Sequence, residues 1–275
     1  MRIEPVRIKG PYGEIAAELL LPRSFDRKSG RCALVVLMHG FLGSKTGTPL
    51  WYLSPALTRE GYAVLRFDFD GYGDSDGAQE NNTVPGMIED AMAVWDYASR
   101  LPFVDRIVII GHSQGGVVAS MAAGRLQKAG TPPAALVLLA SASILKEFAL
   151  KGRFLSARCD PDNPPETINL YGFNMGRGYI ISAQTLPIDE ESSWYTGPVC
   201  LFHGTRDKII PISCSERYDR IYGRSELHRI RWEGHLFLLR PFTLCRLLRR
   251  FLRKTLGSGE AGTAGFADAA TVGEI

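Results

Sequence analysis

The chain has 275 residues, with 32 Lys and Arg against 29 Asp and Glu, a formal net charge of +3, and 45% hydrophobic residues. These values favour one globular domain of the larger kind. The near balance of charge argues against a nucleic-acid partner, because binding phosphate needs a concentrated excess of basic side chains. The N-terminus has no secretory pattern, and the longest apolar runs, such as 134–140, are too short to span a bilayer. We therefore expect a cytoplasmic protein with no membrane partner.

Five cysteines are present, at positions 32, 159, 200, 214 and 245. Their number is odd, and no Cys-x-x-Cys pair occurs. This pattern predicts inert thiols in a reducing compartment and gives no support to a zinc site.

The predicted strands and helices alternate along the chain. Residues 1–9 and 14–21 alternate apolar and polar positions, which predicts an opening antiparallel hairpin. Continuous apolar runs typical of strands buried on both faces follow at 32–38, 62–67, 107–110, 135–140 and 199–202. Between them, a helical apolar stripe at Ile88, Ala91, Met92 and Trp95 and a helix of small residues over 117–127 are predicted. The fold class is therefore α/β, with a mostly parallel, doubly wound sheet and helices on both faces.

The alternation stops between about 141 and 196, a segment rich in Gly, Pro, Asn and aromatic residues. It is too long for a simple connection, so we interpret it as a small cap inserted over the carboxyl edge of the sheet. A last amphipathic helix is predicted over 236–254. The domain then covers 1–255, and a Gly- and Ala-rich disordered tail is expected over 256–275.

The strongest motif is Gly-His-Ser-Gln-Gly-Gly at 111–116, between the strand at 107–110 and a predicted helix. In this context G-x-S-x-G is a nucleophile elbow, a sharp turn that exposes the serine hydroxyl above the sheet and beside a helix N-terminus. Small residues two positions away on either side, Gly111 and Gly115, make the turn sterically accessible. Ser113 is therefore the candidate nucleophile.

A serine nucleophile needs a base and an orienting acid, which follow it in the order acid then histidine on this fold. Asp207 comes just after the strand at 199–202, and His235 comes after the next predicted strand, 227–232. We predict Ser113, Asp207 and His235 as the catalytic triad.

Other residues of the same types fit this order less well. His39 and His112 precede Ser113, and His228 lies inside a predicted strand. Asp219 falls in a helical stretch, and Glu233 is too close in sequence to His235.

Two backbone N–H groups are needed to stabilise the oxyanion of the reaction. Gln114 follows the nucleophile and supplies one. The other is assigned to Phe41, in the glycine-containing loop 39–43 after a buried strand. The acid-rich stretch 68–77 lacks the terminal Glu and flanking helices of an EF-hand, so we predict no metal and no cofactor.

These motifs together resemble the bacterial feruloyl (cinnamoyl) esterases of the α/β-hydrolase superfamily. The residues that carry the resemblance are His39-Gly40-Phe41, FDFDGYGDSDG at 67–77, GHSQGG at 111–116 and HGTRD at 203–207. The resemblance implies hydrolysis of hydroxycinnamate esters, the triad and oxyanion residues named above, and a small cap in which Tyr179 faces the phenolic ring. The partner is then a small-molecule ester, and a homodimer is left open.

One position departs from the family pattern. Some members of this family use a carboxylate near the start of the cap to bind the phenolic hydroxyl. Phe148 stands at that position here, and Glu147 beside it is an open alternative. A general short-acyl esterase, a thioesterase, a lipase-like esterase or a peptidase on the same fold therefore stays an alternative. A receptor without catalytic activity is a third hypothesis, which the complete triad order disfavours.

Overall fold

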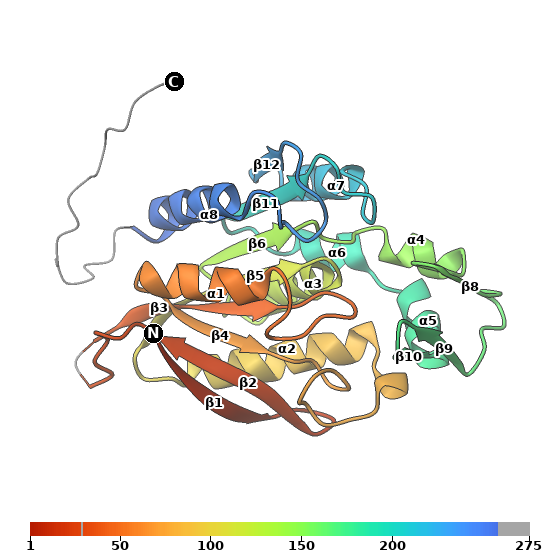
Figure 1. The fold of residues 1–275 in the computed structure, drawn as a ribbon, viewed down its shortest axis with the longest axis horizontal. Coiled ribbons are helices and arrows are strands. Elements are labelled where there is room, and N and C mark those ends of the chain that lie inside the picture. Colours follow the sequence, from red (N-terminus) through yellow and green to blue (C-terminus); the bar gives the residue numbers. More distant parts are fainter. Residues whose placement is uncertain (29, 258–275) are drawn as a thin grey trace.

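The computed structural model describes residues 1–28 and 30–257, so the predicted tail lies outside the described residues beyond position 257. An eight-stranded sheet runs through the molecule (Figure 1). Its strands, in spatial order, are β1 (Arg2–Lys9), β2 (Glu14–Leu21), β4 (Ala63–Phe67), β3 (Cys32–Met38), β5 (Val104–His112), β6 (Ala135–Leu139), β11 (Val199–Gly204) and β12 (Glu226–Ile230). Strands β1, β2 and β4 pair antiparallel, and β4 through β12 pair parallel. The predicted α/β fold class is confirmed.

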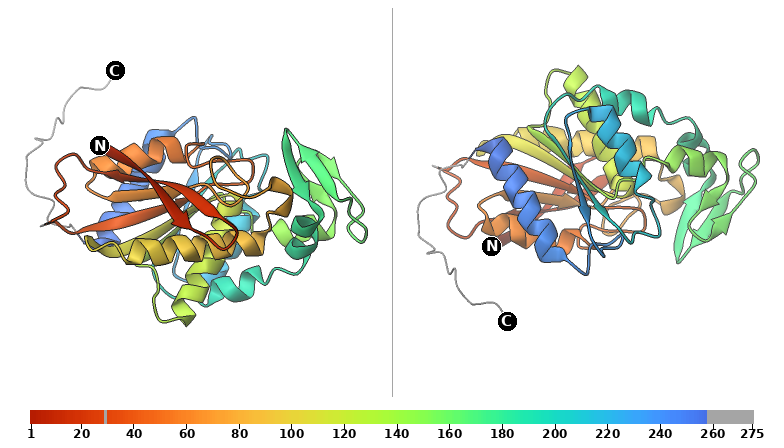
Figure 2. Two further views of the ribbon diagram at one scale, coloured as in Figure 1. Left: turned by 90° about the horizontal axis from the view of Figure 1, so that it is seen from below. Right: turned by 90° about the horizontal axis from the view of Figure 1, so that it is seen from above.

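Helices cover both faces of the sheet (Figure 2). One face packs against α2 (Val84–Ser99), α3 (Gln114–Lys128) and α7 (Ser213–Tyr222), and the other against α1 (Leu50–Arg59) and α8 (Pro241–Leu256). Each face of the sheet forms one apolar layer with its helices, called here the α2 layer and the α1 layer. Side chains of β3 alternate between them: Val36 and Met38 point into the α2 layer, whereas Val35 and Leu37 point into the α1 layer. This double burial explains why the central strands are continuous apolar runs.

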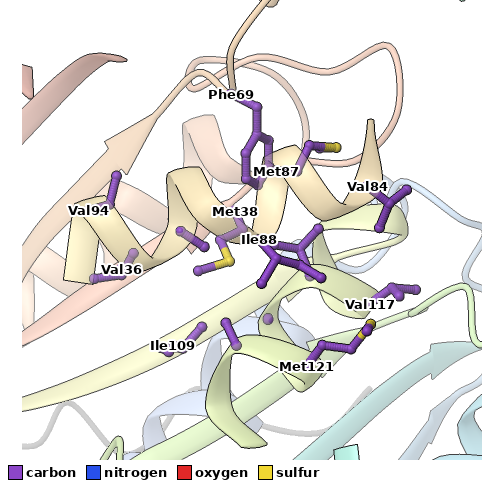
Figure 3. Packing of buried hydrophobic residues seen from close by; sticks show 14 of the residues in the cluster. Val36, Met38, Phe69, Val84, Met87, Ile88, Val94, Ile109, Val117 and Met121 are labelled. Atoms are coloured by element: carbon purple, nitrogen blue, oxygen red, sulfur yellow. The ribbon is translucent and has the colours of Figure 1, made fainter. Parts of the chain in front are cut away.

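Figure 3 shows the α2 layer from close by, where side chains of β3 and β5 meet those of α2 and α3. Val36, Met38, Ile88, Ile109 and Val117 are all no more than 1% exposed. This packing of buried apolar side chains holds the start of α3 against the carboxyl ends of β3 and β5.

Two predicted boundaries near the C-terminus are corrected. The last helix begins at Pro241, not at 236, and it continues to the buried Leu256, one residue into the predicted tail. The Glu233 carboxylate accepts hydrogen bonds from the N–H groups of Leu239 and Arg240, which holds the preceding residues in a loop. Pro241 then starts the helix at a position where its missing N–H costs nothing.

The segment between β6 and β11 is structured. It contains a helix α4 (Leu145–Leu150), the hairpin of β7 (Arg153–Phe154) and β8 (Ala157–Arg158), the hairpin of β9 (Thr167–Leu170) and β10 (Phe173–Gly176), and the helices α5 (Arg177–Gln184) and α6 (Ile188–Ser193). The part from α4 to α5 lies beyond one end of the sheet (Figures 1 and 2), whereas α6 packs on α3 and α7. That this segment acts as a cap stays a prediction.

No helix in residues 1–28 and 30–257 is long and apolar enough to cross a membrane. The cytoplasmic location stays a prediction.

One buried carboxyl group in α2, that of Asp90, has a hydrogen-bond partner at only one of its two oxygens. Asp90 is 0% exposed, and its Oδ2 accepts the Asp70 N–H at 2.9 Å, while its Oδ1 has no hydrogen-bond partner. Burial, with smaller effects from the charges of Asp70 and Glu89, raises the pKa of Asp90 to about 7, although the Asp70 N–H opposes this shift. Because the folded-state pKa lies above the unfolded one, the Asp90 contribution to stability is lost as pH rises toward and through 7.

Replacing this carboxyl by an uncharged isostere tests the linkage. Between pH 5 and pH 8 we expect Asp90→Asn to remove about 2 kcal/mol of the wild-type decline in unfolding free energy, because the amide still accepts a hydrogen bond but cannot ionise. Urea unfolding at both pH values measures this difference. Asp96→Asn, on the exposed side of the same helix, is the control and should leave the decline unchanged. Identical pH dependence in wild type and Asp90→Asn would contradict the linkage.

Candidate active site

Ser113 stands at a sharp turn between β5 and α3. Its φ of 55° and ψ of −119° lie in a region that residues other than glycine rarely adopt. A Cβ on Gly111 would lie 2.2 Å from the Gly115 carbonyl oxygen, and one on Gly115 would lie 2.2 Å from the His39 carbonyl oxygen. The first contact is local to the elbow. The contact at Gly115 shows that the backbone of α3 also packs directly against the backbone at the end of β3.

The structure brings the three predicted triad residues together at the carboxyl ends of β5, β11 and β12. The Ser113 Oγ lies 3.0 Å from the Nε2 atom of His235, and the His235 Nδ1 atom lies 2.7 Å from the Oδ2 atom of Asp207. A carboxylate only accepts hydrogen bonds, so Nδ1 carries the proton and Nε2 is free to accept the serine proton.

Asp207 is held as an anion. Its second oxygen, Oδ1, accepts the N–H groups of Ile209 and Ile210 at 2.8 and 2.9 Å. Burial on its own would raise the pKa of Asp207, but the hydrogen bond and charge of His235 outweigh it and the pKa is lowered. The charged carboxylate therefore orients His235 throughout the neutral range.

The His235 loop is fixed by two residues with no predicted function. Burial, followed by the charge of His235, lowers the pKa of His112 to about 3, so its ring is neutral, and its Nε2–H donates to the His235 carbonyl oxygen at 2.9 Å. The Glu233 carboxylate, 1% exposed, accepts the N–H of Gly234 on one side of His235 and of Leu239 on the other. Glu233 therefore shapes the loop and makes no triad contact; an acid directly before Gly-His was the only sequence signal for this role.

The loop after β3, over 39–43, is anchored by His39. This buried histidine donates through Nδ1 to the Gly40 carbonyl oxygen at 2.8 Å and accepts the Phe69 N–H at Nε2 at 3.2 Å. Its burial lowers its pKa, which keeps the ring neutral in this arrangement. Phe41 and Gln114, the predicted oxyanion residues, both line the same pocket as Ser113. Their assignment as donors stays a prediction.

The acid-rich stretch is used for loop structure. Asp68, 0% exposed, accepts hydrogen bonds from the N–H and Nζ of Lys45 and from the Asp74 N–H. Asp76 accepts the Glu14 N–H. Across residues 1–28 and 30–257, no group of three or more His, Cys, Asp and Glu side chains is arranged to hold a metal ion.

A pocket of about 570 Å³ opens beside Ser113, within the range of ligand sites. Its apolar wall combines core and predicted cap residues, among them Phe41, Leu145, Phe148, Phe154 and Tyr179. A smaller cavity of about 230 Å³ lies between α1 and α8 and includes no triad residue.

The residues at the start of α4 are separated by the structure. Phe148 lines the pocket, whereas Glu147 does not and instead accepts a 2.6 Å hydrogen bond from Arg217 of α7. Glu147 therefore does not take the place of the phenol-binding carboxylate. Tyr179 is 2% exposed, and its hydroxyl donates to the Gln114 Oε1 atom at 2.9 Å, so it ties α5 to the residue beside the nucleophile.

Known proteins resemble this chain in sequence and in fold. The family described as "Serine aminopeptidase, S33" matches residues 30–158. The structure of Est1E from Butyrivibrio proteoclasticus with bound ferulic acid superposes with a TM-score of 0.85 at 28% identity, covering 91% of this chain and 99% of that one. The chain has the α/β-hydrolase fold. The motif-based resemblance is confirmed, and the site has the residue arrangement expected of a serine hydrolase of this fold.

The curated relatives found by sequence are longer than this chain. The chain is 27% identical over 235 residues to lysophosphatidylserine lipase ABHD12 of Danio rerio, and 26% identical over 245 residues to the protein of the same name in Mus musculus. These alignments cover 80% and 84% of the chain but only 58% of either relative. A Pyrococcus furiosus esterase, Pf2001, has a TM-score of 0.69 at 19% identity and shows the shared fold alone.

The fit between the 39–43 loop and the nucleophile can be tested at Gly40. A Cβ there would lie 2.9 Å from the Ser113 Cβ and 3.2 Å from the His112 Nδ1 atom. We expect Gly40→Ala to lower kcat/KM for p-nitrophenyl acetate by about tenfold to a hundredfold, because small displacements at a reacting centre are costly. Gly178→Ala in α5 meets only Thr83 at 3.6 Å and serves as the control. Full activity of a folded Gly40→Ala variant would contradict the close approach.

Proposed function

We propose that this hydrolase cleaves carboxylic esters through an acyl-enzyme at Ser113. The observation that carries the proposal is the continuous hydrogen-bond path from Ser113 through His235 to Asp207, at 3.0 and 2.7 Å. Nucleophile, base and orienting acid in this geometry are the requirements for acyl transfer.

In the first half-reaction the Ser113 oxygen bonds to the ester carbonyl carbon while His235 Nε2 takes its proton. Asp207 stabilises the resulting imidazolium, and the N–H groups of Phe41 and Gln114 bind the oxyanion. The bond to the alcohol oxygen then breaks, and His235 returns the proton to the leaving alkoxide. In the second half-reaction water repeats the sequence on the acyl-enzyme and releases the carboxylic acid and free Ser113.

The proposed acyl group is aromatic, of the hydroxycinnamate kind. Three aromatic side chains support this: the Phe41 and Tyr179 ring centroids are 5.7 Å apart, and those of Phe154 and Tyr179 are 6.0 Å apart, all on the pocket wall. Ferulic acid is bound in the similar structure of Est1E. With Phe148 in place of a carboxylate, ring recognition relies on apolar and edge-to-face contacts more than on the phenolic hydroxyl.

Aminopeptidase activity, suggested by the name of the matching family, is disfavoured by the pocket. Binding an α-ammonium group calls for an anionic side chain nearby. No Asp or Glu is among the described residues that line this pocket. Short-acyl esterase, thioesterase and lipase activity use the same triad and stay alternatives that substrate comparison separates.

Removing the nucleophile tests the reaction class. Ser113→Ala should lower kcat for p-nitrophenyl acetate by roughly 10⁴- to 10⁶-fold, and Asp207→Asn by roughly 10³- to 10⁴-fold, since triad members act as a unit. A fluorophosphonate probe should label wild type and not Ser113→Ala. Glu233→Gln, which retains an acceptor in the loop, should keep measurable labelling. Hydrolysis near the wild-type rate by Ser113→Ala would remove the assignment.

The acyl preference is tested at the pocket wall. Phe148→Ala should lower kcat/KM for methyl ferulate about tenfold or more through lost apolar contact, and change that for p-nitrophenyl acetate by about twofold or less. Leu150→Ala, on the same helix but 51% exposed and outside the pocket, is the control. A panel with a thioester, a long-chain ester and an aminoacyl anilide completes the comparison. Equal losses on both esters would argue against an aromatic acyl site.

A further inference from the structure

Basic side chains gather at the pocket beside Ser113. Arg153, Arg158 and Lys208 line it and are exposed, whereas the aromatic residues Phe154 and Tyr179 are buried. Within residues 1–28 and 30–257, none of the three cations forms an ion pair with an Asp or Glu side chain. Arg158 instead donates two hydrogen bonds from Nη1, to the carbonyl oxygens of Leu155 and Ala157. The outer part of the pocket is therefore positively charged and not internally neutralised.

The two arginines are placed face to face by strand register. Arg153 of β7 is the direct partner of Arg158 of β8, so both side chains leave the same face of this hairpin. Like charges directly opposite each other across an antiparallel pair are destabilising. An anion bound between them would remove that repulsion and use the planar donor arrays of both guanidinium groups.

The third cation comes from a different part of the fold. Lys208 lies in the loop after β11, directly after Asp207. The Asp207 carboxylate is already occupied by His235, Ile209 and Ile210, so it makes no ion pair with Lys208. The hairpin and the triad loop thus bring positive charge to one pocket from two elements.

We propose that the preferred ester carries an anionic oxyacid group, a carboxylate or a phosphate, on its alcohol part, and that Arg153, Arg158 and Lys208 bind this group. The inference rests on the proposed ester hydrolysis and specifies its substrate class. The aromatic wall is buried and receives the acyl group, which leaves the alcohol to occupy the exposed, cationic part of the pocket. Release of the alcohol then breaks these contacts together with the ester bond.

Matched anionic and neutral substrates test the charge preference. Feruloyl glycolate is compared with feruloyl glycolamide for a carboxylate, and 2-feruloyloxyethyl phosphate with its dimethyl ester for a phosphate. Wild type should favour the anionic member of at least one pair by about tenfold in kcat/KM at low salt, and less at 0.5 M NaCl because of screening. The pair with the larger ratio identifies the oxyacid.

Three neutralising variants locate the effect. Arg153→Gln, Arg158→Gln and Lys208→Gln should each lower the ratio of kcat/KM between the anionic and the neutral member by about threefold to tenfold. Lys151→Gln, an exposed lysine outside the pocket, is the matched control. Arg158 also closes its hairpin turn, so Arg153→Gln and Lys208→Gln keep the test valid if Arg158→Gln unfolds locally.

Failure of this inference is distinguishable from failure of ester hydrolysis. Calorimetric binding of both substrate pairs to Ser113→Ala measures the charge preference without turnover. Tighter binding of an anionic member by Ser113→Ala, with no hydrolysis by wild type, would retain the anion site and overturn the proposed reaction. Equal affinity and equal turnover of neutral and anionic members, or equal losses on both in the three variants, would overturn the anion site alone.

Discussion

The backbone contact between the start of α3 and the end of β3 is the constraint on which the site depends. Gly115 allows the helix to approach the His39 carbonyl oxygen at a distance where any Cβ would clash. This approach puts the loop after β3 against Ser113 and the N-terminus of α3 beneath the reacting centre. The dry packing of α2 against β3 and β5 holds the helix in place, so apolar burial stabilises a strained serine conformation.

Four histidines lie around Ser113: His235 is the proposed base, and the other three have structural hydrogen bonds. His39, His112 and His203 are buried, and the pKa of each is lowered chiefly by burial, so each stays neutral. A neutral imidazole has one donor and one acceptor nitrogen, which lets each ring connect two specified groups. His203, for example, joins the Ile210 carbonyl oxygen to the Ser215 hydroxyl behind Asp207. None of these three rings then adds a positive charge beside the imidazolium proposed to form on His235.

Charge is distributed unevenly between the core of the site and its opening. Around Ser113, the carboxylates of Asp207 and Glu233 accept hydrogen bonds from loop N–H groups, and that of Asp68 accepts one from Lys45. At the opening, Arg153, Arg158 and Lys208 have no such partners among the described residues. The carboxylates near Ser113 are thus already paired, whereas the three cations at the opening remain available for a ligand.

The sheet, the nucleophile elbow and the candidate positions Asp207 and His235 could be predicted from sequence, because each depends on short-range pattern: apolar runs, small residues around Ser113, and strand ends before the acid and the histidine. Tertiary structure decided what local pattern cannot encode. Phe148 lines the pocket whereas Glu147 accepts a hydrogen bond from Arg217 of α7, and the Tyr179 hydroxyl of α5 reaches Gln114. The pairing of Arg153 with Arg158 likewise needed strand register, which a pair of two-residue strands does not reveal in sequence.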